Sequence, residues 1–336
     1  EVLLGTPADW RQWGLSQRSI NYLTNPDLLS IDKDLSWLQG AANRHLIKIT
    51  DPQYPAQLKQ IYDPPPLLFL TGNPAILHLP QIAIVGSRTP SPQGRENALM
   101  FSQALSAAGL VVTSGLAVGI DTCAHQGAIG ESQLTVAVLA TGPEQVYPRE
   151  NRELAAEIAA KGALLTEFPV GTPPLAEHFP RRNRIVSGLS VGVLVVEAAL
   201  RSGSLITARL ALEQGREVLS VPGSIHNPKS RGCHQLLRQG AHLVETCEDV
   251  LYGLNIDIKQ YLNRFMTEQE APQPDALVDQ NLLNSMGFDP VSIDQLVARS
   301  GLTSAEVSSM LLTLEMEGRV QASLGGIYTR VVKGEK

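Results

Sequence analysis

The residues best suited to chemistry are arginines and serines that stand beside glycines in four short segments. These segments are Val85-Gly-Ser-Arg88, Ser114 to Asp121, Arg201 to Thr207, and Val221-Pro-Gly-Ser224. Glycine lets backbone N–H groups approach an anion closely, while hydroxyl and guanidinium groups donate further hydrogen bonds to phosphate. Together the segments predict a phosphate-binding site, although any one alone could be only a tight turn between a strand and a helix.

A further segment is rich in guanidinium groups. Phe179-Pro-Arg-Arg-Asn-Arg-Ile185 places three arginines, an amide and an aromatic ring close together. Guanidinium groups bind phosphates through paired hydrogen bonds, Asn183 can bind a base edge or a sugar, and the phenyl ring can stack on a base. In the alternative interpretation, the ring belongs to the core and Arg184 pairs internally with Glu167 or Glu197.

The same segments lack the signatures of common enzymes. Gly86-Ser-Arg-Thr-Pro-Ser91 lacks the second and third glycines of the dinucleotide-binding motif, and the sequence contains no P-loop. Asp121 and His125 share a predicted helix, but no serine or cysteine near them forms a nucleophile elbow. Asp121 is equally explained as a helix cap and His125 as a core residue. Because no cluster has the spacing of metal ligands, we predict no catalytic residue, metal or cofactor, and a protein that is not an enzyme.

Short apolar runs precede these segments and predict the fold. The runs are Ile82–Val85, Leu110–Thr113, Leu134–Ala140, Val191–Val196 and Val218–Val221. Their valine, isoleucine and leucine content is typical of strands buried on both faces, and the stretches between them suit crossover helices. The sequence therefore predicts an α/β fold with a doubly wound, mostly parallel sheet, whose loops gather at the carboxyl ends of the strands. A further run, Leu67–Leu70, follows several prolines and predicts an edge strand.

The sequence also predicts four parts. Residues 1–50 form a small helical module, residues 51–252 the core with the sheet, residues 253–276 a polar linker, and residues 277–332 a C-terminal domain. In the last of these, two helical stretches break at Gly301, and Thr303 with Glu306 has the spacing of a capping box. A predicted hairpin that turns at Gly325-Gly326 follows them, which is the pattern of a winged helix.

Composition and charge limit the class of protein. With 336 residues and 43% hydrophobic content, the chain is too apolar to be disordered, and no stretch approaches the roughly 20 apolar residues of a membrane span. Three scattered cysteines predict no disulfide framework, so a reducing cytoplasm is expected. The net charge is −6, yet residues 181–240 hold nine Lys and Arg against three Asp and Glu, a local +6. This asymmetry indicates that anions gather at one place, the alternative being a solvated basic surface.

Several motifs follow one another in a recognisable order. They are Val85-Gly-Ser-Arg88, Ser114-Gly-Leu-Ala117, Gly119-Ile-Asp121 with His125, Tyr147-Pro148 with Asn151, Phe179-Pro-Arg-Arg-Asn-Arg184, Ser202-Gly-Ser204 with Thr207-Ala208, and Pro222-Gly223. Together they resemble the DNA-processing protein A family (DprA, also called Smf). The resemblance extends over nearly the whole chain and is strongest between about residues 81 and 244.

The resemblance implies an extended Rossmann-like core between a sterile-alpha-motif-like module and a winged-helix-like module. It also implies a cytoplasmic homodimer that binds and protects single-stranded DNA and helps to load the recombinase RecA during natural transformation. The expected DNA-binding residues are Gly86, Ser87, Arg88, Ser114, Gly115, Phe179, Arg182, Asn183, Arg184, Ser202, Gly203 and Ser204.

Two departures from the family pattern limit what is carried over. His234 stands where many relatives have asparagine, so we assign it no ligand role. The predicted helix over residues 303–317 contains Glu306, Glu315 and Glu317 but no Lys or Arg. Because a recognition helix that faces phosphates is normally basic, we expect this module to contact protein rather than DNA. The same acidity disfavours a transcription regulator.

An enzyme is the alternative function. Related Rossmann-like folds include phosphoribohydrolases that cleave nucleoside monophosphates, and these resemble one another in a Pro-Gly-Gly-x-Gly-Thr motif followed by glutamate. Here Pro222-Gly-Ser-Ile225 breaks that pattern.

Overall fold

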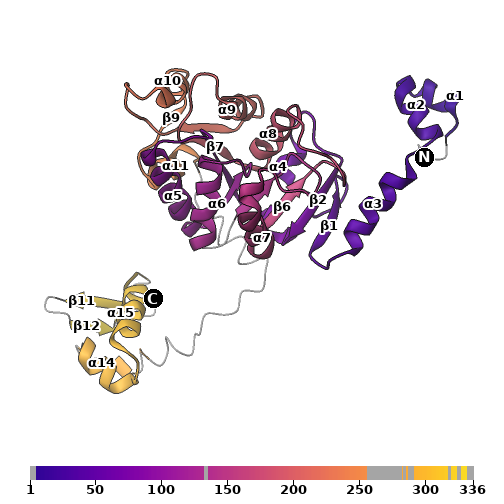
Figure 1. Ribbon diagram of the computed structural model, residues 1–336. Coiled ribbons are helices and arrows are strands. Elements are labelled where there is room, and N and C mark those ends of the chain that lie inside the picture. Colours follow the sequence, from indigo (N-terminus) through magenta and orange to yellow (C-terminus); the bar gives the residue numbers. More distant parts are fainter. Residues whose placement is uncertain are drawn as a thin grey trace. The chain divides into compact units, whose positions relative to one another are not determined.

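The computed structural model describes residues 5–131, 135–255, 282, 285–286, 291–316, 319–323 and 327–330. The chain divides into two compact units, Glu1–Asn263 and Arg264–Lys336 (Figure 1). Within the described ranges, none of the helices combines the length and the apolar character needed to cross a membrane.

A nine-stranded sheet forms the centre of the first unit. Its strands are β1 (Arg44–Lys48), β2 (Leu67–Gly72), β3 (Gln81–Val85), β4 (Val111–Ser114), β5 (Thr135–Val138), β6 (Ala163–Thr166), β7 (Gly192–Val195), β8 (Glu217–Ser220) and β9 (His242–Leu243). The order across the sheet is β1-β2-β6-β5-β4-β3-β7-β8-β9. Strands β3 to β9 run parallel to one another, whereas β1 pairs with β2, and β2 with β6, in antiparallel fashion. The predicted mostly parallel α/β sheet is confirmed.

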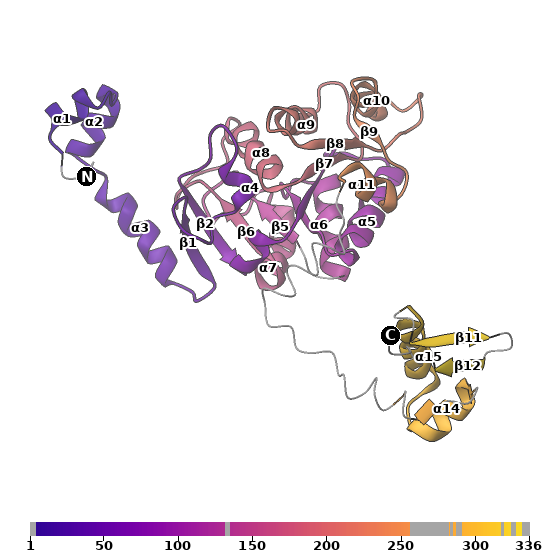
Figure 2. The ribbon, with the colours of Figure 1, turned by 180° about the vertical axis from the view of Figure 1, so that it is seen from behind.

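Helices cover both faces of this sheet (Figures 1 and 2). The helices of the unit are α1 (Pro7–Gln12), α2 (Gln17–Thr24), α3 (Leu28–Gln39), α4 (Ala56–Lys59), α5 (Pro92–Ala107), α6 (Ile120–Glu131), α7 (Arg152–Lys161), α8 (His178–Leu189), α9 (Gly203–Glu213), α10 (Arg231–Arg238) and α11 (Cys247–Gly253). Three short 3₁₀ turns, η2 (Pro74–His78), η3 (Arg149–Asn151) and η4 (Pro228–Ser230), complete the described elements.

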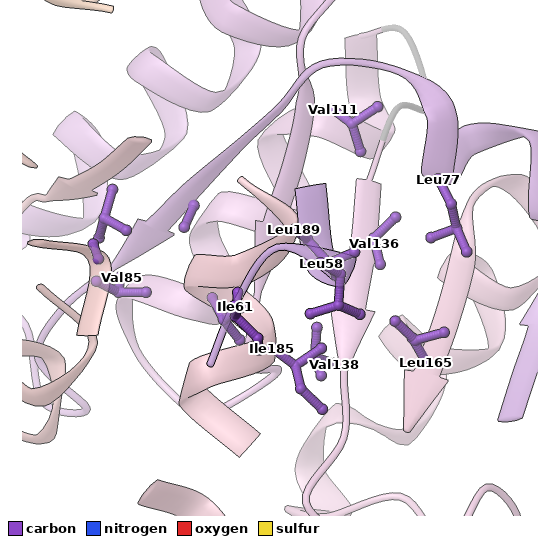
Figure 3. Packing of buried hydrophobic residues seen from close by; sticks show 14 of the residues in the cluster. Leu58, Ile61, Leu77, Val85, Val111, Val136, Val138, Leu165, Ile185 and Leu189 are labelled. Atoms are coloured by element: carbon purple, nitrogen blue, oxygen red, sulfur yellow. The ribbon is translucent and has the colours of Figure 1, made fainter. Parts of the chain in front are cut away.

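Strand β3 shows why continuous apolar runs form the centre of the sheet. All its residues are buried, and alternate side chains point to opposite faces. Ile82 and Ile84 pack with residues of α5 and α6, whereas Ala83 and Val85 pack with α8 and α9. Figure 3 shows part of the cluster that contains Ala83 and Val85, in which Leu58 of α4 lies near Ile185 and Leu189 of α8 and near the strand residues Val136 and Val138. A strand covered on both faces has no position at which a polar residue would be solvated.

Two expectations about the beginning of the sheet were wrong. Strand β2 is not an edge strand, because β1 pairs with it over Arg44–Lys48 and occupies the edge. The N-terminal helical module therefore ends before residue 50: its last helix stops at Gln39, and the residues that follow belong to the sheet. Strands β1, β6 and β9 were also not predicted.

The order of the strands reverses between β3 and β7. From β3 the chain proceeds through β4 and β5 to β6 on one side, and then crosses to β7, β8 and β9 on the other. The helices that follow β3 and β7 consequently lie on opposite faces, which leaves a crevice at the carboxyl ends of these two strands. Ligands of open α/β sheets bind in such crevices.

The described part of the second unit includes helices α14 and α15 and a three-stranded sheet. Its described elements are β10 (Val291–Ser292), α14 (Ile293–Ser300), α15 (Ser304–Met316), β11 (Val320–Ser323) and β12 (Ile327–Arg330), with strand order β10-β12-β11. The capping box is present, since Thr303 N donates to Glu306 Oε2 at 2.8 Å and Glu306 N donates to Thr303 Oγ1 at 3.4 Å. The linker from residue 256 and the turn at Gly325-Gly326 lie outside the described residues.

Candidate nucleic-acid interface

A cavity of about 380 Å³ lies where the strand order reverses. We call it the switch pocket. Its lining consists of Val85, Gly86, Ser87, Arg88, Gly115, Ala117, Asp121, Asn183, Val186, Ala199, Arg201, Ser202, Gly203, Ser204 and Thr207. These residues come from the end of β3, from the loops after β3, β4 and β7, and from helices α6, α8 and α9. Three of the four predicted glycine segments therefore meet at one place.

The positive charge of the switch pocket comes from Arg88 and Arg201. Both arginines are exposed, and neither forms an ion pair with another residue in the described part of the chain. Helix α9 begins at the same wall, with Ser202 as N-cap accepting a hydrogen bond from Ser204 N at 3.3 Å. Two unpaired guanidinium groups beside a helix N-terminus suit a phosphate group.

The loops that line the pocket are bound to one another. Ile120 N donates to Ser87 O at 3.1 Å, and Ser87 N donates to Glu197 O at 2.7 Å. Gly119 has a φ of +91°, and a Cβ at this position would overlap the carbonyl oxygen of Ser87. Only glycine fits this crossing, so Gly119 is needed for the packing of the two loops, whereas Gly115 of the same segment lines the pocket.

Arg182 differs from its predicted role as a phosphate ligand. Its side chain is buried, with the residue 4% exposed, and the guanidinium group donates to Gly115 O at 2.6 Å and to Val138 O. Burial lowers its pKa to about 10 despite the nearby carboxylate of Asp121. Arg182 therefore holds the loop after β4 through its hydrogen bond to Gly115 O and does not point into the pocket.

Asp121 forms the floor of the switch pocket. Its Oδ2 accepts hydrogen bonds from Gly115 N at 3.1 Å and Ala117 N at 3.3 Å, so the carboxylate closes the loop at the start of α6. Burial raises the pKa of Asp121, and the guanidinium group of Arg182 opposes that shift. Asp121 is therefore not the predicted helix cap, because it lies within α6 and accepts from the loop that precedes the helix rather than from the N–H groups of the first turn.

The other two arginines of the rich segment pair internally. Arg184 Nη2 lies 2.6 Å from Glu167 Oε2, and Arg181 Nη2 lies 3.0 Å from the same oxygen. Arg184 also approaches Asp63 at 3.5 Å, and its side chain is only 12% exposed. The alternative interpretation, in which Arg184 pairs with Glu167, is therefore correct. Glu197 instead accepts hydrogen bonds from Ser91 N at 2.8 Å and Asn227 Nδ2 at 2.9 Å.

Phe179 belongs to an aromatic contact at the edge of the pocket. Its ring meets that of Tyr147 at a centroid distance of 5.6 Å and an interplanar angle of 64°. Arg88 Cζ lies 5.6 Å from the centre of the Phe179 ring. Phe179 is half-buried and Tyr147 is exposed, so this aromatic pair and the pocket arginine form one continuous surface.

The structure brings together eight of the twelve predicted residues in the switch pocket. These are Gly86, Ser87, Arg88, Gly115, Asn183, Ser202, Gly203 and Ser204. Ser114 is fully buried and donates to Ile84 O at 2.7 Å, so its hydroxyl group does not reach the pocket. Arg201 also lines the pocket, although it is not among the twelve expected residues. Its position in the third glycine segment is the sequence feature that indicates it.

His125 is a core residue. It is fully buried on α6, and its Nδ1 lies 2.7 Å from Thr135 Oγ1. Because the Thr135 hydroxyl group donates to Val112 O at 2.7 Å, it accepts from His125, which must carry its proton on Nδ1. Among the residues that the structure describes, Nε2 has no hydrogen-bond partner. Burial lowers the pKa of His125 to about 3.

Comparison with protein families identifies two matching models. The family described as DNA recombination-mediator protein A matches residues 45–255, and the DprA winged helix domain matches residues 266–326. The first match includes every residue of the switch pocket.

Individual proteins are also similar to this chain. Protein Smf of Escherichia coli (strain K12) is 43% identical over 326 residues, which cover 96% of this chain and 86% of that protein. The X-ray structure of DprA from Streptococcus pneumoniae has a TM-score of 0.66 and 41% identity, covering 71% of this chain and 83% of that one. A Helicobacter pylori DprA structure, described as giving insights into a single-stranded DNA binding mode, has a TM-score of 0.58 and 27% identity, covering 66% and 96%.

Replacing Arg182 by alanine should destabilise the fold. The change removes the donor to two buried carbonyl groups and the cation that stabilises the charged form of Asp121, and leaving buried polar groups unsatisfied costs about 1–3 kcal/mol. We expect the free energy of unfolding, measured by urea titration, to fall by that amount. The control Arg209→Ala removes an exposed arginine paired only with Glu213 at 3.7 Å and should change it by less than about 0.5 kcal/mol. Unchanged stability in Arg182→Ala would show that the buried contacts are unimportant.

The titration of His125 should make the protein less stable in acid. An unfolded histidine has a pKa of about 6.5, so between that pH and about 3 the unfolded chain binds a proton that the folded chain excludes. Stability therefore falls as pH decreases through this window, by up to about 1.4 kcal/mol per pH unit from this residue. Urea unfolding of wild type and His125→Gln between pH 6.5 and 4.5 measures the effect. The variant should lose less stability than wild type, and equal losses would contradict the assignment.

Proposed function

This chain belongs to the DNA recombination-mediator protein A family, and on that premise we propose that it binds single-stranded DNA in the switch pocket. The observation that carries the proposal is the meeting of Arg88 and Arg201, both without ion-pair partners in the described chain, at the N-terminus of α9. A phosphodiester there would receive two guanidinium groups and the positive end of a helix dipole.

The aromatic pair favours an unpaired strand over a duplex. Phe179 and Tyr147 lie beside Arg88, so a strand held by its phosphate at Arg88 would bring a neighbouring base to these rings. Stacking on a side chain requires an exposed base face, which duplex DNA does not offer away from its ends. The relative from Helicobacter pylori, whose structure is described in terms of single-stranded DNA binding, is consistent with this preference.

We further propose that the protein acts by binding and not by catalysis. Asp121 Oδ2 accepts two backbone hydrogen bonds and His125 is fully buried, which supports a structural role for both residues. The motif that departs from the phosphoribohydrolase pattern, Pro222 to Ser224, lines a separate cavity of about 150 Å³ with Glu197. Release of free base from a nucleoside monophosphate would contradict this proposal.

The remaining parts of the proposal concern partners. We propose a cytoplasmic homodimer that protects the bound strand and promotes RecA loading during natural transformation. Two linked switch pockets would hold a long strand more tightly than one, because the second contact becomes intramolecular. Helix α15 carries Glu306 and Glu315 and no basic residue, which favours contact with protein rather than with DNA.

The switch-pocket arginines give the most direct test of DNA binding. We expect labelled oligo-dT to bind more tightly than duplex of equal length in fluorescence anisotropy. Arg88→Ala and Arg201→Ala should each weaken oligo-dT binding by about tenfold or more, since a hydrogen bond to a charged group contributes about 1.5–3 kcal/mol. Each should also lower the slope of log affinity against log salt by about 0.7, the value for one phosphate contact on a single strand.

Arg209→Ala is the matched control, because it removes an exposed arginine that does not line the pocket. It should leave both affinity and salt slope unchanged. Equal affinity of wild type for oligo-dT and duplex would contradict the proposed preference, and unchanged salt slopes in both pocket variants would contradict the phosphate contacts.

Assembly and RecA loading are tested by two separate measurements. Sedimentation equilibrium at micromolar concentration should give twice the mass of one chain. Addition of the protein to RecA and single-stranded DNA should increase the initial rate of DNA-dependent ATP hydrolysis by RecA, because loading precedes hydrolysis. A monomer that binds long oligonucleotides no more tightly than short ones, or an unchanged ATPase rate, would contradict the corresponding part.

A further inference from the structure

We propose that a second cavity, next to the switch pocket, binds another nucleotide of the same single strand. We call it the Tyr147 cavity. It measures about 530 Å³ and is lined by Val118, Gln145, Val146, Tyr147, Pro148, Arg149, Glu150, Arg152 and Pro174. The inference rests on the proposed binding of single-stranded DNA and extends it to a second subsite.

The side chains of the Tyr147 cavity suit a nucleotide. Arg149 and Arg152 are exposed and form no ion pair with another residue of the described ranges, while Glu150 carries the opposing charge. The lining therefore has a net positive charge available for one phosphate. Tyr147 is 47% exposed and offers an aromatic face. The volume lies within the range of about 300–1,000 Å³ that is usual for small-molecule sites.

Two connections join this cavity to the switch pocket. The first is the loop after β4, in which Ala117 lines the switch pocket and its neighbour Val118 lines the Tyr147 cavity. The second is the chain of contacts from Arg88 through Phe179 to Tyr147, each 5.6 Å long. A strand that leaves Arg88 would cross the Phe179 ring and arrive at Tyr147. The two cavities therefore lie along one path for consecutive nucleotides.

Hydrogen bonds of Asn151 join the segment of the Tyr147 cavity to the loop after β4 and to α6. Asn151 is buried, and its Nδ2 donates to Leu116 O at 2.9 Å and to Thr122 Oγ1 at 3.0 Å. Leu116 has a φ of +57°, a conformation that non-glycine residues rarely adopt. The segment that carries Arg149 and Arg152 is thus fixed to the loop that forms the switch pocket. Such preorganisation reduces the entropy lost when a strand binds.

A comparison of short and long oligonucleotides tests the second subsite. We compare wild type with Arg149→Ala/Arg152→Ala, using labelled thymidine oligonucleotides of four and twelve nucleotides in fluorescence anisotropy. The double variant should bind the longer one about tenfold or more weakly, with a salt slope lower by about 0.7 for each lost phosphate contact. Its affinity for the shorter one, held by the switch pocket, should stay within about twofold of wild type.

The controls separate the possible outcomes. Arg209→Ala/Arg238→Ala removes two exposed arginines that line neither cavity and should change neither affinity. Tyr147→Ala removes a stacking face that a short strand held at Arg88 can also reach, so it should weaken the longer oligonucleotide more than the shorter one. If wild type binds both oligonucleotides and both Tyr147-cavity variants match it, or lose affinity equally for the two lengths, the second subsite is overturned while the proposed function stands. If wild type binds neither oligonucleotide, the proposed function fails as well.

Discussion

The burial of the Arg182 guanidinium group is the constraint on which the switch pocket depends. It joins α8 to the ends of β4 and β5 through Gly115 O and Val138 O, and it lies near the carboxylate of Asp121 that closes the same loop. A Cβ at Gly115 would overlap the guanidinium group, so the glycine and the arginine require each other. A cation in this position is tolerable only because backbone carbonyls and a carboxylate replace its water. The floor of the pocket is consequently rigid, and its ligand-binding charge must come from elsewhere.

The fate of each arginine in Phe179–Ile185 could not be predicted from the sequence. Successive side chains of a helix point about 100° apart, so arginines that are neighbours in the sequence meet different surroundings in the fold. Arg182 reaches carbonyl groups 67 and 44 residues away, and backbone acceptors leave no mark in a sequence. Arg184 meets Glu167, a carboxylate that composition had indicated as one of two partners. The glycine segments were predictable because the chain itself places them after strands, where a parallel sheet collects its loops.

The strands also fall into two groups. Some are predicted by apolar runs in the sequence, and others form only through contacts with neighbouring strands. Strands β3, β4, β5, β7 and β8 are covered on both faces and read as valine-rich or isoleucine-rich runs. Strand β1 mixes Arg44, His45 and Lys48 with two apolar residues, and β9 has only two residues. These edge strands form because a neighbour supplies hydrogen bonds, which no local pattern records. The prolines before β2 predicted an edge strand. They precede the strand, however, so the backbone groups of β2 can pair with β1 on one side and β6 on the other.

The charge distribution follows from these two results. In the segment with a local charge of +6, Arg181, Arg182 and Arg184 contact other residues of the protein. The arginines that cluster in the sequence are therefore not the ones that cluster at the switch pocket. The exposed guanidinium groups that do converge come from distant positions, with Arg88 and Arg201 brought together only because β3 and β7 are neighbours. A site built from a few such groups offers a phosphate group direct contacts rather than a broad positive field. In a chain with a net charge of −6, this arrangement places the groups best suited to an anion at the carboxyl edge of the sheet.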